Sequence, residues 1–396
     1  MPIDPARRVI VMVAQPPPTA NTPASPTQPQ SNRHQTKTLP CPCLLAEPPP
    51  FPWYLLAMSP VSTATSSGAS AAPPSESPPL GLKMKAFFLW NLMYWLSTAL
   101  ALVMLIGPVI YPQTIGLYVT LPYLTFSLFK RDELKFGSPW PSFSQNFAVF
   151  ACLRRYLDLE FAPLPEKLKT AEKAEHAQFI FAVFPHGTSS DFRILMDGIL
   201  HTVLPSVADK VRVLTASVLF RIPLVREIAM WTNCVDARRS VAENLLDNHY
   251  SILVLPGGMD EQILTQYQKE TIYLRKRKGF VKLAMRKGVP VVPVYVFGSS
   301  DQFATSNALF GARHWIMKNL KMCIPLAQGL AGSACPLPVK TTIVMGEPVS
   351  FSPKVAGQPT QDEIDSAHGE FIQAVIALFD EHKSRLGYGE RSLNVV

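Results

Sequence analysis

The most informative stretch of this chain is residues 178–187, which read QFIFAVFPHG. Their apolar first part is typical of a strand that is buried on both faces. His186 stands at the expected strand end, Gly187 follows it, and Asp191 lies five positions after the histidine. A histidine held at a strand end can act as a general base, and a nearby carboxylate would orient its ring. The alternative is a histidine that caps the sheet edge, with Asp191 an ordinary acid in a first helical turn.

This strand belongs to an alternating pattern of short apolar runs and helical segments. Strands rich in Val, Ile or Leu are expected at 178–184, 211–217, 251–255, 290–297 and 341–345. Helices are expected at 190–203, 223–232, 238–248 and 278–287, and residues 140–161 before them resemble an amphipathic helix that leads into a loop. Such alternation predicts an α/β domain, residues 132–396, with a mostly parallel sheet flanked by helices. The clearest helix begins after Thr360, which forms a capping box with Glu363.

A second strand-to-loop junction, residues 255–261, reads LPGGMDE. Gly257 and Gly258 would let backbone N–H groups approach a ligand oxygen, because glycine has no side chain in the way. Glu261 would bind a hydroxyl group or orient a partner. The alternative is a tight turn that needs glycine, with its two acids in solvent.

A basic block follows at 275–287. Arg275, Arg277, Lys278 and Lys282 would bind the phosphates of coenzyme A or of lipid headgroups. The alternative is a solvated basic helix face. Arg239, which follows Arg238 just before an expected helix, is a weaker anion-site candidate, and its alternative is a surface pair.

Residues 86–129 contain no charged side chain over 44 positions. One membrane-spanning helix needs about 20 apolar residues, so this run is long enough for two. Prolines and a glycine interrupt it near the middle, and Lys or Arg residues flank both ends. Residues 83–131 therefore predict a membrane hairpin with both ends on the cytoplasmic side. A re-entrant wedge that does not cross the membrane and a buried soluble hairpin are the alternatives.

Residues 1–82 form a tail rich in Pro, Ser and Thr, and 19 of the 38 prolines lie in the first 80 positions. Such a composition cannot bury a core, so this tail is expected to be disordered. A cleaved secretory signal is not expected, because prolines interrupt the short apolar run after Arg7 and Arg8. A transit function stays open.

The whole-chain composition limits the class of partner. Apolar residues make up 47% and charged residues 17%, and the net charge is +8. That sign suits membrane phosphates or coenzyme A, and no nucleic-acid partner is expected, because no zinc finger or RNA-binding signature occurs. Six cysteines without a CxxC pair support neither a disulfide framework nor a metal site. No phosphate-binding loop, dinucleotide fingerprint or G-x-S-x-G nucleophile motif is present.

Taken together, these blocks resemble the type-2 diacylglycerol acyltransferase family, which also includes monoacylglycerol acyltransferases and related wax and sterol acyltransferases. The resemblance covers roughly residues 85–392. It rests on an ordered set of motifs: FPHG at 184–187, PLVRE at 223–227, GG-x-x-E at 257–261, RKGFVKLA at 277–284, VPVYVFG at 292–298 and GEP at 346–348.

The resemblance implies a membrane enzyme of the endoplasmic reticulum, and of lipid droplets, with an α/β fold similar to that of glycerolipid acyltransferases. It would move a fatty acyl group from acyl-coenzyme A to the hydroxyl group of diacylglycerol, form triacylglycerol and use no cofactor. His186 corresponds to the family's catalytic histidine, whereas Phe184 replaces the first histidine of the usual His-Pro-His-Gly. Asp191 matches the His-x4-Asp dyad of the wider glycerolipid acyltransferase group, and Glu261 and Arg239 fall where the family has polar residues.

Further expectations follow from the resemblance. Phe184, Pro185 and Gly187 would line the substrate site beside Gly257 and Gly258. Acyl-coenzyme A, diacylglycerol and membrane lipids would be the partners, with a homo-oligomer as a further option. The acceptor choice stays open among diacylglycerol, monoacylglycerol, a long-chain alcohol, a sterol and a lysophospholipid. From another class, a non-catalytic lipid-binding hairpin protein is the competing interpretation.

Overall fold

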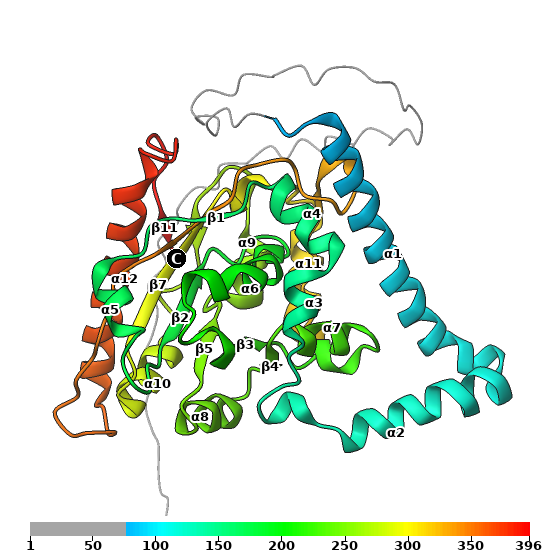
Figure 1. The fold of residues 1–396 in the computed structure, drawn as a ribbon, viewed down its shortest axis with the longest axis horizontal. Helices are drawn as coiled ribbons and strands as arrows, with labels where there is room; N and C mark the ends of the chain where they lie inside the picture. The colour runs from blue at the N-terminus through cyan, green and yellow to red at the C-terminus, as the bar shows by residue number, and fades with distance from the viewer. Residues whose placement is uncertain (1–76) are drawn as a thin grey trace, which may run out of the picture. The chain divides into compact units, whose positions relative to one another are not determined.

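The computed structural model describes residues 77–396 and builds them around a seven-stranded sheet (Figure 1). The strands lie in the order β1-β10-β7-β2-β5-β3-β4. Their bounds are β1 Glu160–Phe161, β2 Ile180–Phe184, β3 Val211–Thr215, β4 Cys234–Asp236, β5 Ser251–Val254, β7 Val291–Phe297 and β10 Thr342–Met345. Every neighbouring pair is parallel except β10 with β7. The predicted α/β fold with a mostly parallel sheet is therefore confirmed.

Helices cover both faces of this sheet (Figure 1). Their bounds are α3 Pro141–Asn146, α4 Ala148–Tyr156, α5 Glu166–Ala171, α6 Asp191–Val203, α7 Val225–Trp231, α8 Arg239–Asp247, α9 Gly258–Leu264, α10 Gly279–Lys287, α11 Phe310–Leu320 and α12 Gln361–Lys383. Two small pairs of strands lie outside the sheet: β6 Thr271–Ile272 pairs with β11 Asn394–Val395, and β8 Ala304–Thr305 pairs with β9 Ala327–Gln328.

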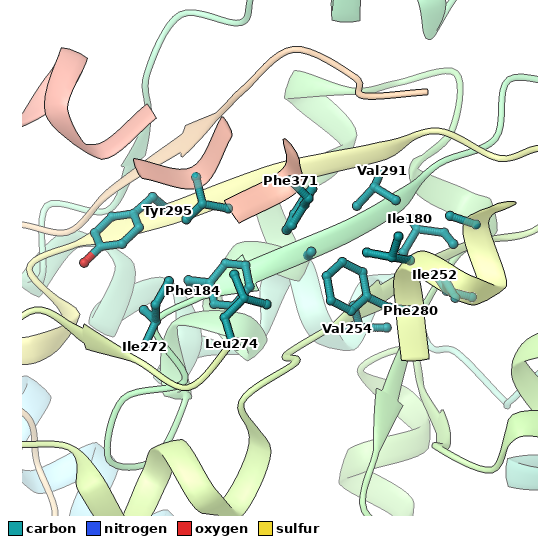
Figure 2. Packing of buried hydrophobic residues seen from close by; sticks show 14 of the residues in the cluster. Ile180, Phe184, Ile252, Val254, Ile272, Leu274, Phe280, Val291, Tyr295 and Phe371 are labelled. Atoms are coloured by element: carbon teal, nitrogen blue, oxygen red, sulfur yellow. The ribbon is translucent and has the colours of Figure 1, made fainter. Parts of the chain in front are cut away.

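The central strand β2 explains why the sheet needs helices on both sides. Successive side chains of a strand point to opposite faces. Ile180, Ala182 and Phe184 accordingly join one buried cluster, which includes side chains of α10 and α12, while Phe181 and Val183 join a second cluster with side chains of α6. Figure 2 shows the first cluster, in which Phe184 and Phe371 of α12 belong to the same packed layer.

The observed elements fall close to the predicted ones. Each expected strand is present, and the four expected helices begin and end within two residues of the predicted bounds. Thr360 caps α12 and exchanges capping-box hydrogen bonds with Glu363 as predicted. The segment 140–161 is different: Phe147 adopts an extended backbone and divides it into α3 and α4, and β1 follows. The three-residue strand β4 was too short for its pattern to be recognised.

The uncharged segment forms two helical arms joined at Tyr111. The first arm is α1, Leu80–Ile110, and the second consists of a π-helical stretch, Pro112–Thr120, and α2, Leu121–Phe129. Within residues 77–396, α1 alone is long and apolar enough to cross a membrane, with a mean hydropathy of 1.9 and 6% of its apolar window buried. The second arm is interrupted by its π-helical stretch. That both arms cross the membrane stays a prediction.

Both arms are attached to the α/β domain by polar contacts. Near the start of the first arm, Trp90 Nε1 donates to the carbonyl oxygen of Ala334 at 2.9 Å. At the end of the second arm, the buried Arg226 of α7 donates to the carbonyl oxygen of Lys130 and pairs with Glu133 at 3.1 Å. These contacts fix where the apolar helices leave the domain. The tail predicted at 1–82 lies, up to residue 76, outside the described residues.

Candidate active site

His186 follows directly after the carboxyl end of β2. In parallel sheets the loops after neighbouring strands meet at one edge, which is where ligands bind. Here the loops after β2, β5 and β7 carry His186, Gly257 and Ser299. Gly187 has a φ of +65°, and a Cβ atom at this position would lie 2.6 Å from Ser299 Oγ. Both observations require glycine beside the histidine.

Glu261 of α9 joins these loops and is almost fully buried, at 1% exposure. Its Oε1 accepts a hydrogen bond from the backbone N–H of His186, and its Oε2 accepts one from the backbone N–H of Tyr273 at 2.7 Å. A Cβ atom at Gly257 would lie 2.1 Å from Glu261 Oε2. Glycine at 257 therefore leaves the space that this carboxylate occupies.

Burial shifts the pKa of both titratable groups, Glu261 and His186, toward the neutral form. Burial raises the pKa of Glu261 to about 7, while the two N–H donors and the nearby Arg277 oppose that rise. Burial lowers the pKa of His186 from its usual 6.5. The Gly187 carbonyl acts in the opposite direction, because it stabilises the charged form of the ring. The imidazole is consequently neutral near pH 7 and available as a base.

The hydrogen bonding of the ring identifies which nitrogen can take a proton. His186 Nδ1 lies 3.1 Å from the carbonyl oxygen of Gly187. A carbonyl oxygen only accepts, so in the neutral ring this bond requires the hydrogen on Nδ1. Nε2 then carries the free lone pair. Through this bond the Gly187 carbonyl fixes the tautomer that a general base needs.

Asp191, the residue expected to orient His186, makes a different contact. It begins α6, and its Oδ2 accepts a hydrogen bond from Ser189 Oγ at 2.6 Å. Burial raises its pKa to about 6. No hydrogen bond or ion pair joins it to the His186 ring within residues 77–396. The Asp191 carboxylate bonds to Ser189 and the His186 ring bonds to the Gly187 carbonyl, so the expected contact between Asp191 and His186 is not made.

The basic block does not converge on one empty anion site. The Arg277 guanidinium pairs with Asp260, lies 3.4 Å from the carbonyl oxygen of Gly257 and leaves Nε buried without a partner in the described part of the chain. Lys278 Nζ pairs with Asp365 of α12 at 2.7 Å. Arg275 donates to the Val395 carbonyl at 2.9 Å, and Lys282 is exposed on α10. Arg277 is therefore the cation that contacts the loops of the site.

The other predicted residues divide between core and surface. Phe184 is fully buried and packs against Phe371, with ring centroids 6.5 Å apart, so it belongs to the core and does not face a ligand. Pro185 is buried beside it. Gly258 begins α9 with a φ of +52° and has open space where a side chain would be. Arg239 is exposed at the start of α8 and pairs with Glu243 at 2.8 Å.

Comparison with known proteins identifies the family. The diacylglycerol acyltransferase family model matches residues 109–395, which is well over half of the chain. The chain belongs to the diacylglycerol acyltransferase family. It is 29% identical over 290 residues to diacylglycerol O-acyltransferase 2 of Bos taurus, an alignment that covers 69% of this chain and 78% of that protein. The Homo sapiens protein of the same name is also 29% identical over 290 residues, covering 69% and 72%.

A relative with a different name matches over a similar length. The 2-acylglycerol O-acyltransferase 3 of Homo sapiens is 26% identical over 284 residues, covering 67% of this chain and 80% of that protein. This chain is thus an acyltransferase of the diacylglycerol acyltransferase family, and its relatives differ in the acceptor that their names give. The resemblance noted from the motifs is confirmed.

Two supporting residues of the site were not predicted. Ser299, against Gly187, follows the strand expected at 290–297, and the parallel pairing of β7 with β2 would have placed it at the same edge. Tyr273 contributes its backbone N–H, which no side-chain pattern reveals, and its ring lies under the Arg277 guanidinium, 5.2 Å from the ring centroid. Within residues 77–396 no three His, Cys, Asp or Glu side chains are placed to hold a metal ion.

Proposed function

We propose that this acyltransferase moves a fatty acyl group from acyl-coenzyme A to the free hydroxyl group of diacylglycerol and forms triacylglycerol. The observation that carries the proposal is the bond between His186 Nδ1 and the Gly187 carbonyl, which leaves Nε2 of a neutral imidazole free as a base. Because the chain belongs to the diacylglycerol acyltransferase family, we infer that this base serves an acyl-transfer reaction.

The reaction needs two proton transfers, one to His186 from the acceptor hydroxyl group and one from His186 to the leaving sulfur. His186 Nε2 takes the proton of the acceptor hydroxyl group while the oxygen attacks the thioester carbonyl carbon. The carbon–sulfur bond then breaks, the new ester is released, and the imidazolium returns the proton to the coenzyme A sulfur. No acyl-enzyme forms. Base assistance of this kind contributes about 10²–10⁴-fold to a rate, and holding both substrates together supplies further acceleration.

Backbone N–H groups are the natural partners for the tetrahedral oxyanion. The N–H groups of Gly187 and Gly257 lie at the two loop junctions, and neither has a hydrogen-bond acceptor among the described residues. Donors that are fixed in place before the reaction stabilise developing charge without reorganisation. We assign the oxyanion site to this pair.

The two carboxylates act at a distance from the transferred proton. Both oxygens of Glu261 are occupied by backbone N–H groups, so it positions His186. Asp191 begins α6 directly after the His186 loop, and we assign it a through-space role in which its negative charge would favour the imidazolium formed during the reaction. An Asp191→Asn variant checks this role, because it would lower kcat about tenfold while the KM for each substrate stays unchanged.

The binding of the donor and the location follow from charge and hydropathy. Arg277, with its buried Nε, and the exposed Lys282 are the cations best placed for coenzyme A phosphates, with Arg275 and Lys278 as neighbours. The apolar α1 would hold the site at a membrane surface, where the acylglycerol resides. We place the enzyme in the endoplasmic reticulum membrane with both ends of the hairpin in the cytosol, and on lipid droplets.

A second candidate acceptor is monoacylglycerol, because one relative is named for 2-acylglycerol. The test uses microsomes from a yeast strain that lacks storage triglyceride and expresses this chain. Labelled oleoyl-coenzyme A is supplied with diacylglycerol, monoacylglycerol, a fatty alcohol, a sterol or lysophosphatidate. Triacylglycerol as the main product supports the proposal, and another ester as the main product replaces the acceptor.

Two variants accompany the acceptor panel. His186→Ala would remove the product, whereas His176→Ala, which changes an exposed histidine before β2, would leave it unchanged. If no acceptor gives an ester that depends on His186 while the protein is present in the membrane, a non-catalytic lipid-binding function takes the place of the enzyme.

A further inference from the structure

The segment 391–396 lies beyond α12, and its contacts converge on the loops around His186. We infer that this segment is a positioning element for the catalytic histidine, which it supports through Glu261 on one side and through the Ser299–Asp301 turn on the other. The inference rests on the proposed function in taking His186 as the base. Two separate sets of contacts carry it.

The first set is a backbone path through β11 and β6. Asn394 N donates to the Glu270 carbonyl at 2.8 Å, Val396 N donates to the Ile272 carbonyl at 2.9 Å, and Leu274 N donates to the Val396 carbonyl at 2.9 Å. In a strand, alternate backbone groups point to opposite sides. Residues 270, 272 and 274 therefore face β11.

Tyr273 lies between Ile272 and Leu274, and its N–H points away from β11. That N–H donates to Glu261 Oε2 at 2.7 Å, and Glu261 Oε1 accepts from the His186 N–H. Ile272 and Leu274 are fully buried in the cluster that contains Phe184, the residue two before His186 (Figure 2). Pairing of residues 270–274 with β11 thus sets the position of Tyr273, whose N–H holds the Glu261 carboxylate.

The second set is an ionic path from Arg391. Its guanidinium makes two bonds to Asp301, Nη2 to Oδ1 at 2.9 Å and Nη1 to Oδ2 at 3.0 Å, and a third bond to Glu270 Oε1 at 2.8 Å. Each of these three side chains is less than 9% exposed. A bidentate arginine–carboxylate pair fixes geometry as well as charge.

Asp301 ends the turn whose first residue, Ser299, lies against Gly187. Ser300, between them, donates its hydroxyl group to Glu270 Oε2 at 3.0 Å. Arg391 consequently holds both the turn that supports Gly187 and the residue before β6. The two paths meet at Glu270, whose backbone pairs with β11 and whose side chain pairs with Arg391.

The test breaks one hydrogen bond of β11 without changing a buried side chain. The Asn394 side chain is exposed, so Asn394→Pro removes the N–H that bonds to Glu270, and Asn394→Ala is the matched control that keeps it. We expect Asn394→Pro to lower kcat about tenfold per folded molecule, because small misplacements of catalytic groups are costly. The KM values for oleoyl-coenzyme A and for dioleoylglycerol would stay within about twofold, since no substrate contact is changed.

A second variant makes the test independent of whether the proline variant folds. Arg391→Lys keeps the positive charge and loses the bidentate bond to Asp301. Its control is Arg385→Lys, which makes the same change at a nearby exposed arginine. We expect Arg391→Lys to lower kcat several-fold and to retain more activity than Arg391→Ala.

Folded protein is measured by size-exclusion chromatography in detergent, so that kcat is referred to intact molecules. An unchanged kcat in Asn394→Pro and Arg391→Lys, or a change confined to KM, overturns the inference. If His186→Ala is inactive in the same assay, the proposed function stands even then. If His186→Ala is fully active, the proposed function fails, whatever the variants of segment 391–396 do.

Discussion

The Glu261 carboxylate accepts the backbone N–H of His186, although the two residues are 75 positions apart in the chain. The same carboxylate accepts the N–H of Tyr273, and Gly257 provides the space in which it lies. One buried acid therefore joins the loop after β2, the loop after β5 and the residue directly after β6. The proposed base is therefore held by this distant acid at its backbone N–H and by the adjacent Gly187 carbonyl at its ring.

Glu261→Gln should lower kcat about tenfold to a hundredfold, because an amide offers one oxygen acceptor where the carboxylate offers two, and one backbone N–H loses its partner. Measuring kcat against protein content checks this. Gln262→Ala is a demanding control: Gln262 also bonds to the loop, through the Thr188 carbonyl at 2.5 Å, but not to His186. Equal losses in both variants would contradict a specific role for the carboxylate.

The pH dependence should have two components on its acid side. A lowered pKa means that His186 becomes protonated only below its usual 6.5, so loss of the base reduces kcat/KM below that pH. Glu261, with its pKa raised to about 7, ionises as the pH rises through 7 and then accepts both N–H groups, so activity should also increase there.

The variant Glu261→Gln separates the two components, since it has no titration near 7. Its remaining activity should fall only below pH 6.5, while the wild type already falls between about pH 7.5 and 6.5. Profiles of kcat/KM at constant ionic strength make the comparison. If kcat/KM of both the wild type and Glu261→Gln showed one decrease, beginning above pH 7, the assignment of a neutral His186 would be contradicted.

Gly187→Ala should reduce both stability and activity. Its φ of +65° disfavours any side chain, and the new methyl group would meet Ser299 Oγ at 2.6 Å. We expect a loss of about 1–3 kcal/mol in the free energy of unfolding together with a large loss of kcat. Gly279→Ala, at the start of α10 with open space and no positive φ, is the matched control and should be tolerated.

Arg277→Ala should raise the KM for acyl-coenzyme A more than it lowers kcat, because its guanidinium is the cation that contacts the catalytic loops. About a tenfold rise in KM corresponds to the loss of one charge-assisted contact. The exposed Arg239 provides the control, and Arg239→Ala should leave this KM unchanged. A larger effect for Arg239 would move the phosphate site to α8.

Much of this fold was predictable because its signals are local. The apolar runs of β2, β5 and β7 are short and buried on both faces, and helical segments separate them, so the α/β class and the shared edge follow from the sequence. The strand-end positions of His186 and Gly257 follow as well. The family motifs point to His186 as well, the histidine proposed here as the base.

The rest depends on contacts between distant residues. The His-x4-Asp spacing gives only the separation of His186 and Asp191 in the sequence. Their contacts depend on the local backbone, in which Ser190 is left-handed and the Gly187 carbonyl bonds to the His186 ring. Phe184 was assigned to the site from its motif, although the alternation of β2 places it on the same face as Ile180 and in the core. The pairing of Arg391 with Asp301, 90 residues away, leaves no local pattern.

The most direct test of the account is the turnover number of His186→Ala in microsomes, measured with saturating oleoyl-coenzyme A and diacylglycerol and corrected for the amount of membrane-bound protein. We predict a loss of at least about a hundredfold in kcat, with normal membrane association and no acyl group attached to the wild-type protein in the absence of acceptor. A kcat within a few-fold of the wild-type value, or an acyl-enzyme trapped on any side chain, would contradict His186 as the general base.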